Sequence, residues 1–330
     1  MAVDGHEVID LHAHIVLEDA FGHAGRYGPT LTDDDSGRPA FRVGTYELKP
    51  MPYRGSLFMD VEKRLAVMAD IGIDRQMLSP NPLTFFGGVE SEAATGFARV
   101  TNEAMAATVA ADPDRLIGSA QIPLQDVAAA QRELDRAAAA GLVAAYIGTD
   151  YGIALDDVRL DPFYRQLVEL DLPLFIHPAT NDGRSPAADQ RLHRFGLDLI
   201  VGYTYEETLT VATLVLGGVF DRHPDLDVCI SHGGGAIAYL VERFDSMARF
   251  RRQPADFGDQ LRHLWFDAHM EPGPARQLLV DLVGAERMVY GTNLGGWDTP
   301  AAADAFDASL SANARRLLRQ TATEEGRTSP

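Results

Sequence analysis

The stretch at residues 7–14, Glu-Val-Ile-Asp-Leu-His-Ala-His, ends on two histidines at spacing i, i+2. The β-branched Val8 and Ile9 predict that it begins as a strand. Because side chains alternate along a strand, His12 and His14 would project from the same face. Neutral imidazole is a good ligand for zinc and related metals, so the pair is the start of a candidate metal site. Taken alone, the pair fits equally well with one hydrogen-bonded and one solvated histidine at a strand end.

Three further histidines come at or just after the ends of apolar runs that are typical of buried strands. With the first pair they make five of the ten histidines in the chain: His12, His14, His177, His232 and His269. Any one of them alone would more often be a hydrogen-bonded core residue than a ligand. Five such histidines at the ends of four predicted strands are hard to explain by packing. We therefore predict that they share a metal site.

The elements that must position these histidines alternate along the chain. Strands are expected at 7–14, 75–79, 116–122, 142–148, 172–177, 226–232, 263–267 and 287–293. Helices are expected at 61–71 and 90–111, in the alanine-rich segment that ends at residue 140, and at 162–170, 206–220, 236–252, 274–283 and near 313–319. Eight strand–helix units predict parallel strands in a closed (β/α)₈ barrel of the TIM type, whose active site lies where the strands end. The alternative, an open doubly wound sheet, is less favoured because no Gly-x-Gly-x-x-Gly follows the first strand.

Two segments fall outside this alternation. Residues 15–57 form a long insertion after the first strand, rich in Gly, Pro and Asp, which we expect to be irregular and to act as a lid or substrate loop. Residues 321–330 form a polar tail. No linker or low-complexity tract divides the rest, so residues 1–330 are expected to form a single metal-dependent barrel domain.

Composition narrows the partners and the compartment. A formal net charge of −19 at pH 7 argues against nucleic acid and an anionic membrane surface as partners. The N-terminus has no signal-peptide pattern, and no apolar run approaches the roughly 18 residues of a membrane span. The single cysteine, Cys229, excludes an intramolecular disulfide and a cysteine zinc cluster, and its apolar neighbours predict a core residue. A cytoplasmic location follows as the default.

Three of the predicted strand ends carry motifs of a known family. The chain resembles the amidohydrolase superfamily, in particular its aminocarboxymuconate-semialdehyde decarboxylase-like branch, in His12-Ala13-His14, Ile176-His177-Pro178 and Ser231-His232-Gly233-Gly234-Gly235. The resemblance continues through 217–226, 283–287 and 313–317 and covers nearly the whole chain except 15–57. It implies a (β/α)₈ barrel with one divalent metal, most often zinc. The implied ligands are an aspartate at the end of the last strand and His12, His14 and His177.

The same resemblance implies roles for further residues. His232 would be the general acid/base beside the metal. Arg243 would reach the substrate carboxylate of the neighbouring subunit in a homodimer, and Arg54 lies near the position of a second carboxylate-binding arginine. These roles are physically sound, because arginine binds a carboxylate through two parallel hydrogen bonds and a metal on three neutral histidines keeps its full charge. Glu206 and Glu207 are interpreted as helix-start residues rather than as part of the site.

The end of the last strand departs from the family pattern. Asn293 stands where the family has its ligand aspartate, and as a neutral isostere it offers a metal only a weak carbonyl oxygen. His269, after the seventh strand, is an additional candidate ligand that would hold a second metal together with His232, or else supports the substrate or the ligands. Trp297, just past the last strand, is a candidate wall of the substrate pocket. Carboxylates that would complete a second metal site are Asp150, Asp267 and Asp298.

Three classes of function follow from these residues. The favoured one is a non-oxidative decarboxylase, or a related C–C lyase, that acts on a small or aromatic carboxylic acid and uses zinc. The second is a hydrolase or hydratase that uses metal-bound water. The third is a non-haem oxygenase with one or two irons, which the departures at Asn293 and His269 would suit. Manganese is a further alternative metal.

Overall fold

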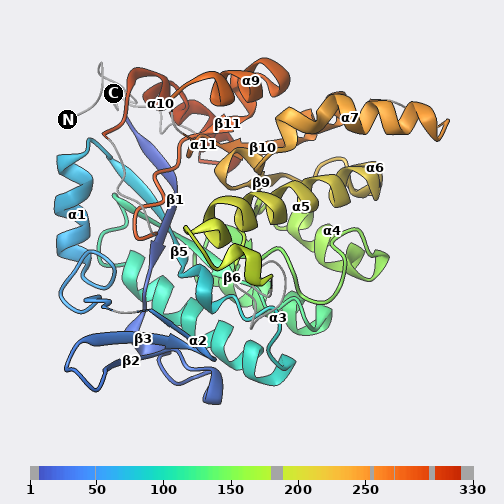
Figure 1. The fold of residues 1–330 in the computed structure, drawn as a ribbon. Coiled ribbons are helices and arrows are strands. Elements are labelled where there is room, and N and C mark those ends of the chain that lie inside the picture. Colours follow the sequence, from blue (N-terminus) through green and yellow to red (C-terminus); the bar gives the residue numbers. More distant parts are fainter. Residues whose placement is uncertain are drawn as a thin grey trace, which may run out of the picture.

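Eight parallel strands form the centre of the molecule, and each pairs with the next along the chain (Figure 1). The computed structural model describes residues 7–48, 50–179, 189–252, 256–270, 272–296 and 302–320. The eight strands are β1 (Ile9–Ile15), β5 (Arg75–Pro80), β6 (Leu116–Gln121), β7 (Ala144–Ile147), β8 (Leu174–Ile176), β9 (Val228–Ile230), β10 (Leu264–Asp267) and β11 (Met288–Val289). Their order in the chain is therefore also their order around the barrel.

The first strand and the segment after the last strand close the barrel. The backbone N–H of Leu11 donates to the carbonyl of Tyr290 (2.9 Å), and that of His14 donates to the carbonyl of Leu294 (2.7 Å). Ala13 forms a parallel bridge with the same Leu294. The predicted (β/α)₈ barrel is thus confirmed, and the first and last strands meet beside the histidine pair.

Helices surround the strands. They are α1 (Val61–Asp70), α2 (Ser91–Val109), α3 (Val127–Ala139), α4 (Asp161–Glu169), α5 (Thr204–Leu216), α6 (Val219–Arg222), α7 (Ile237–Phe250), α8 (Phe257–Gln260), α9 (Pro274–Val283), α10 (Ala305–Ser309) and α11 (Ser311–Leu317). Asp60 and Asp126 begin α1 and α3, because each carboxylate accepts a hydrogen bond from a backbone N–H of the first turn. The single helix predicted at 206–220 is wrong: Gly218 adopts a left-handed φ of 67° and separates α5 from α6.

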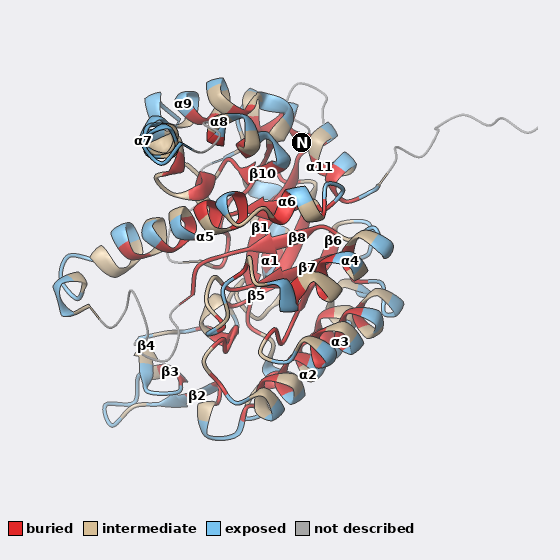
Figure 2. Cartoon of the chain, turned by 90° about the vertical axis from the view of Figure 1, so that its right-hand side faces the viewer, coloured by how far each residue is buried: buried red, intermediate tan, exposed pale blue. Residues whose placement is uncertain are grey.

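Two apolar layers hold the barrel together. Side chains inside it, among them Leu11, Met77, Cys229 and Val289, pack with Leu317 of α11, which closes one end of the barrel. A larger cluster lies between the strands and the helices. The strands are buried along almost their whole length as a result (Figure 2), and Cys229 is a core residue as predicted. Within the described part of the chain, no helix is long and apolar enough to cross a membrane.

The insertion after the first strand contains a small sheet, so the prediction of an irregular segment at 15–57 is wrong. Its antiparallel strands are β2 (Thr30–Asp33), β3 (Pro39–Val43) and β4 (Tyr46–Leu48). Leu31 and Phe41 of this sheet pack with Tyr53 and with Phe97 of α2 in a separate apolar cluster. The three strands are too short, and too closely spaced by turns, to produce a recognisable alternation in the sequence.

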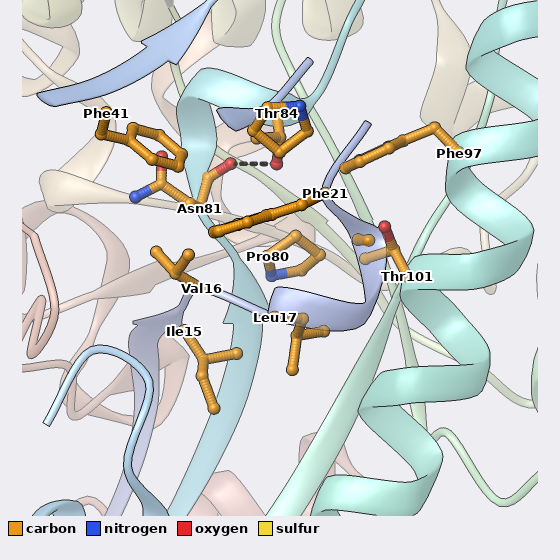
Figure 3. Close-up of a pocket in the computed structure, with 12 residues that line it drawn as sticks. Ile15, Val16, Leu17, Phe21, Phe41, Pro80, Asn81, Thr84, Phe97 and Thr101 are labelled. Atoms are coloured by element: carbon orange, nitrogen blue, oxygen red, sulfur yellow. Dashed lines mark hydrogen bonds between the residues drawn. The ribbon is translucent and has the colours of Figure 1, made fainter. Parts of the chain in front are cut away.

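A small cavity remains where the insertion meets the barrel (Figure 3). Its walls include Leu17 after β1, Pro80 at the end of β5 and Phe97 of α2. The walls are mainly apolar, and the hydroxyl of Thr84 donates to the carbonyl of Asn81 (2.7 Å). The insertion therefore lies against the rim at which β1 and β5 end, which is the rim that carries His12 and His14.

Candidate active site

His12 and His14 lie on β1 and are buried, with 1% of each residue exposed. The Nδ1 atom of His12 is 2.6 Å from Asp267 Oδ2 at the end of β10. The Nδ1 atom of His14 is 2.7 Å from the hydroxyl of Ser79 on β5. That hydroxyl donates its own hydrogen to the carbonyl of Ala13 (3.0 Å), so it accepts from His14. In both rings Nδ1 therefore carries the hydrogen, and Nε2 keeps its lone pair.

His177 follows β8 and has the same arrangement. Its Nδ1 atom donates to the carbonyl of Pro178 (2.6 Å). Its Nε2 atom is buried and has no hydrogen-bond partner among the residues that the structure describes. A buried polar atom without a partner costs free energy, so its presence needs an explanation.

The three imidazoles pack against one another. The Nε2 atoms of His12 and His14 are 3.2 Å apart, a separation at which two lone pairs repel unless a cation lies beside them. The ring centroid of His177 is 4.9 Å from that of His12 and 4.7 Å from that of His14. Orienting each ligand imidazole through its second nitrogen is the usual construction of a protein metal site. The residues present therefore fit a divalent metal.

Burial keeps these imidazoles in the neutral form that binds metals. It lowers the pKa of His12 to about 4, against the opposing attraction of Asp267. It also lowers the pKa of His14 and of His177 well below the usual range, and the neighbouring histidines act in the same direction. No proton competes with a cation for these three nitrogens near neutral pH.

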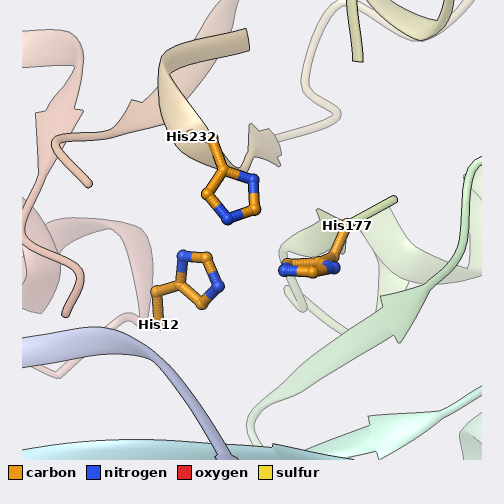
Figure 4. A group of neighbouring side chains, drawn as sticks. All are labelled: His12, His177 and His232. Carbon is orange, nitrogen blue, oxygen red and sulfur yellow. The ribbon is translucent and has the colours of Figure 1, made fainter. Parts of the chain in front are cut away.

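His232 lies in the turn after β9, and its ring points towards those of His12 and His177 (Figure 4). Its ring centroid is 4.9 Å from those of both His12 and His177. Ring nitrogens of these three residues lie within 4.8 Å of one another. The Nδ1 atom of His232 is 2.5 Å from Oε1 of Glu207 on α5. Burial raises the pKa of Glu207, and its pairing with His232 opposes that shift.

Comparisons with known proteins identify the family of the chain. The family model described as Amidohydrolase matches residues 9–324. The chain belongs to the amidohydrolase family. This amidohydrolase is 27% identical over 299 residues to a 2-amino-3-carboxymuconate-6-semialdehyde decarboxylase from Dictyostelium discoideum, covering 86% of this chain and 80% of that protein. It is 29% identical over 334 residues to a gamma-resorcylate decarboxylase from Rhodococcus jostii, covering 93% and 95%.

A further relative and a solved structure are also similar to this amidohydrolase. A 2-keto-4-carboxy-3-hexenedioate hydratase from Sphingobium is 26% identical over 244 residues, covering 71% of this chain and 69% of that protein. The crystal structure of a 5-carboxyvanillate decarboxylase from Novosphingobium aromaticivorans, complexed with manganese and 4-hydroxy-3-methoxy-5-nitrobenzoic acid, superposes with a TM-score of 0.76. That structure is 23% identical and covers 96% of each chain, so the likeness shows the shared fold.

The carboxylate of Asp267 contacts the histidine cluster of this amidohydrolase at Nδ1 of His12. Besides His12, its carboxylate accepts from the backbone N–H of His269 (3.1 Å) and of Gly233 (3.4 Å). Burial alone would raise the pKa of Asp267, but the surrounding His12, His232 and His269 hold it below its usual value. An ionised Asp267 thus fixes the orientation of His12, and its described contacts leave it in a supporting position rather than that of a ligand to a second metal.

Replacing Asp267 with asparagine is expected to weaken metal binding by roughly 10- to 100-fold, because the amide cannot hold the His12 imidazole with the same charge-assisted hydrogen bond. Competition titration against a chelating dye measures the affinity. Asp227→Asn is the matched control, since that carboxylate accepts from Trp265 Nε1 (2.6 Å) outside the cluster. Equal affinities of the Asp267→Asn variant and the wild-type protein would contradict the role given to Asp267.

His269 and Asn293 also reach the cluster. The ring of His269 lies 5.3 Å from that of His232 and 5.5 Å from that of His12. Asn293 is buried and adopts a left-handed φ of 55°, which asparagine tolerates better than most residues. Its backbone N–H donates to the carbonyl of His12 (2.8 Å). Ligation by either residue stays a prediction.

The predicted substrate-binding residues are more scattered. Arg54 pairs with Glu18 (2.8 Å) within the insertion and also donates to the carbonyl of Leu31 (3.3 Å). Arg243 is exposed on α7. Trp297, Asp298 and the tail 321–330 lie outside the described residues. Asp150 accepts from the backbone of its own loop, from Gly152 N–H (2.8 Å).

Besides Ser79, the sequence interpretation missed two neighbours of the histidines. Glu207 was assigned to the start of a helix, and it does lie in the first turn of α5, but it also bonds His232. Tyr203 ends a π-helical turn, Asp198–Tyr203, and its ring lies 6.0 Å from His177 and 6.5 Å from His232. π-helical turns recur at functional sites, but they leave no local signal in a sequence.

Proposed function

We propose that the chain catalyses the non-oxidative decarboxylation of a small or aromatic carboxylic acid, with a divalent metal held by His12, His14 and His177. The observation that supports the proposal is the packing of these three buried imidazoles, each held through Nδ1, against one another and next to a fourth histidine, His232. The relatives named above include decarboxylases of aminocarboxymuconate-semialdehyde and resorcylate. A bound divalent cation would supply a positive charge that attracts and polarises the oxygens of an acidic substrate.

The chain's own residues supply the proton. Non-oxidative decarboxylation breaks the bond between carbon and carboxylate, releases CO₂, and puts a proton on the carbon in its place. His232 is the candidate donor: in its protonated form Nδ1–H bonds Glu207, and the second proton, on Nε2, is the one transferred to the carbon, after which the neutral ring takes up a proton from water. His12, His14 and His177 are buried and neutral, so they do not compete with His232 as proton donors.

For the metal itself we propose zinc. Three neutral imidazoles are a common donor set of catalytic zinc sites. Manganese is the alternative supported by the solved carboxyvanillate decarboxylase that contains it. Asn293 is neutral and would add no negative charge to the metal ligands. Elemental analysis of the purified protein would detect iron if iron were the bound metal.

A hydratase is the second candidate function. It is supported by the Sphingobium hydratase, which matches over 71% of this chain. His232 would then move a proton to or from water instead of to carbon. The named relatives, decarboxylases and a hydratase, do not favour the oxygenase alternative. The cytoplasmic location stays a prediction.

Carbon dioxide release under anaerobic conditions tests the proposal. Protein loaded separately with zinc or manganese is incubated with 2,6-dihydroxybenzoate, 5-carboxyvanillate and aminocarboxymuconate semialdehyde. We expect one CO₂ per substrate consumed without oxygen, a fall of roughly 100-fold or more after chelation, and recovery on adding metal back. A hydrated product that keeps its carboxylate would support the hydratase, and a requirement for oxygen would overturn both.

We also propose that the chain forms a homodimer. Helix α7 projects from the barrel in Figure 1 and exposes Tyr239 and Phe250 at 79% and 84%, and α5 beside it exposes Leu216 at 64%. A second copy would cover this apolar surface and bring Arg243 of α7 towards the partner's substrate. We also propose that Arg54 and Trp297 bind the substrate.

Light scattering on the eluting protein is expected to give about twice the chain mass of 35.9 kDa. Tyr239→Glu places a charge in the apolar surface, so the mass should fall to that of one chain. Arg243→Ala should keep the dimer and raise KM. A wild-type protein that elutes as a single chain at micromolar concentration would rule out this dimer.

A further inference from the structure

Glu207 joins α5 to the turn that carries His232. Its side chain is buried, with 1% exposed, and one oxygen accepts two hydrogen bonds. Oε1 is 2.8 Å from the donating hydroxyl of Ser231 and 2.5 Å from Nδ1 of His232. Oε2 is buried and accepts no hydrogen bond from the residues that the structure describes. All the described hydrogen bonding of this carboxylate is therefore directed at the segment Ser231–His232.

We infer that Glu207 is a positioning residue that fixes the tautomer and the ring direction of His232. A carboxylate oxygen can only accept, so Nδ1 of His232 carries a hydrogen and Nε2 is the nitrogen that faces His12 and His177. The inference rests on the proposed function, in which Nε2 of His232 is the proton-transferring atom. Without an acceptor at Nδ1, a neutral imidazole is free to exchange tautomers and to turn about its Cβ–Cγ bond.

The backbone around His232 is held equally firmly. His232 adopts a left-handed φ of 46°, which is rare for a residue with a side chain and sets the direction of its Cα–Cβ bond. A Cβ at Gly235 would lie 2.3 Å from the carbonyl of Thr204, so the turn and the first turn of α5 are in direct contact. The hydroxyl of Thr208 accepts from the backbone N–H of Ala236 (2.9 Å). With Cα–Cβ set by the backbone, the Glu207 hydrogen bond determines the remaining rotation of the ring.

Three substitutions separate the parts of this role. Glu207→Leu and Glu207→Ala both remove the acceptor, and leucine also keeps much of the side-chain volume. Glu207→Gln keeps a carbonyl oxygen that can accept from Nδ1 but removes the charge. Glu133→Gln is the matched control, because Glu133 is a buried carboxylate on α3 that accepts from Asn102 and Arg136 outside the histidine cluster.

The first measurement needs no substrate. In zinc-loaded protein labelled with ¹⁵N-histidine, the His232 signals are assigned by their loss in His232→Gln, and their shifts report which ring nitrogen carries the hydrogen. We expect protonated Nδ1 in the wild-type protein, in Glu207→Gln and in Glu133→Gln. The two variants without an acceptor should lose that preference at unchanged metal content. A wild-type tautomer in both Glu207→Leu and Glu207→Ala would overturn the inference.

The second measurement is the division between kcat and KM. Loss of the acceptor should lower kcat by roughly 10- to 100-fold with little change in KM, as expected when a partner that orients a functional imidazole is removed. Glu207→Gln should recover part of that loss, whereas Glu133→Gln should match the wild-type protein. Decarboxylation with an unchanged kcat in Glu207→Leu would defeat the positioning role and leave the proposed function intact. Absence of CO₂ release from the wild-type protein would defeat the proposed function, while the ¹⁵N signals still decide the tautomer.

Discussion

Replacing His232 with alanine is expected to lower kcat by about 10²- to 10⁴-fold, the usual contribution of a positioned general acid or base. The proton that replaces the carboxylate must come from a group beside the reacting carbon. The Nδ1 atoms of His12 and His232 both meet a carboxylate, but the His12 side chain is 2% exposed, whereas that of His232 is 18% exposed and can be reached by a substrate. Steady-state kinetics on the substrate identified by CO₂ release measure the loss.

Metal content is the control for this prediction. If His232 acts on the proton and not on the metal, the His232→Ala variant should keep as much metal as the wild-type protein by elemental analysis. Loss of the metal together with activity would instead make His232 a ligand, as its distance to His12 and His177 permits. A kcat within threefold of wild type at full metal content would remove His232 from the reaction.

Replacing His177 with alanine is expected to abolish stable metal binding and to lower activity by more than about 100-fold, beyond the range seen when only a supporting residue is changed. His177 is the proposed ligand whose replacement disturbs the fewest other interactions. Its described side-chain hydrogen bond is to the carbonyl of its neighbour Pro178, so its removal leaves no charged group unpaired. By contrast, removal of His12 would leave the buried carboxylate of Asp267 without its imidazole.

Thermal unfolding with and without metal checks this prediction independently of the substrate. Metal that binds only the folded chain raises the wild-type Tm, and the rise should disappear in His177→Ala. His263→Ala is the control, since His263 is exposed and stacks on Phe220 away from the cluster. An undiminished rise in His177→Ala would show that the metal is held by other residues.

Much of the barrel could be predicted from the sequence, because buried parallel strands and amphipathic helices follow different periods. The histidines His12, His14, His177 and His232 could be found for the same reason, since each comes at or near the end of a strand pattern. The break after α5 was missed, because two adjacent glycines can continue a helix or end it, and packing decides. A Cβ at Gly217 would lie 2.1 Å from Asp156, which shows how closely that segment is packed.

The supporting residues could not be predicted, since their roles depend on distances across the barrel. Asp267 is 255 positions from His12, and Ser79 is 65 positions from His14. The sequence around a carboxylate or hydroxyl at a strand end does not indicate which distant residue it will contact. Glu207 was likewise interpreted from its place in a helix, and only the fold brings it to His232. The small sheet of the insertion was missed because its strands have three to five residues each.

The way the barrel closes has a consequence for how the protein acquires its metal in the cell. β1 leaves the ribosome first, yet one of its two edges is completed only by Tyr290 and Leu294, near the end of the chain. A chain that lacks this segment exposes an unpaired edge strand, so the strand that carries His12 and His14 is not held in place. We therefore expect metal binding to require residues 290–294, and truncation before residue 294 should yield aggregation-prone protein with little bound metal.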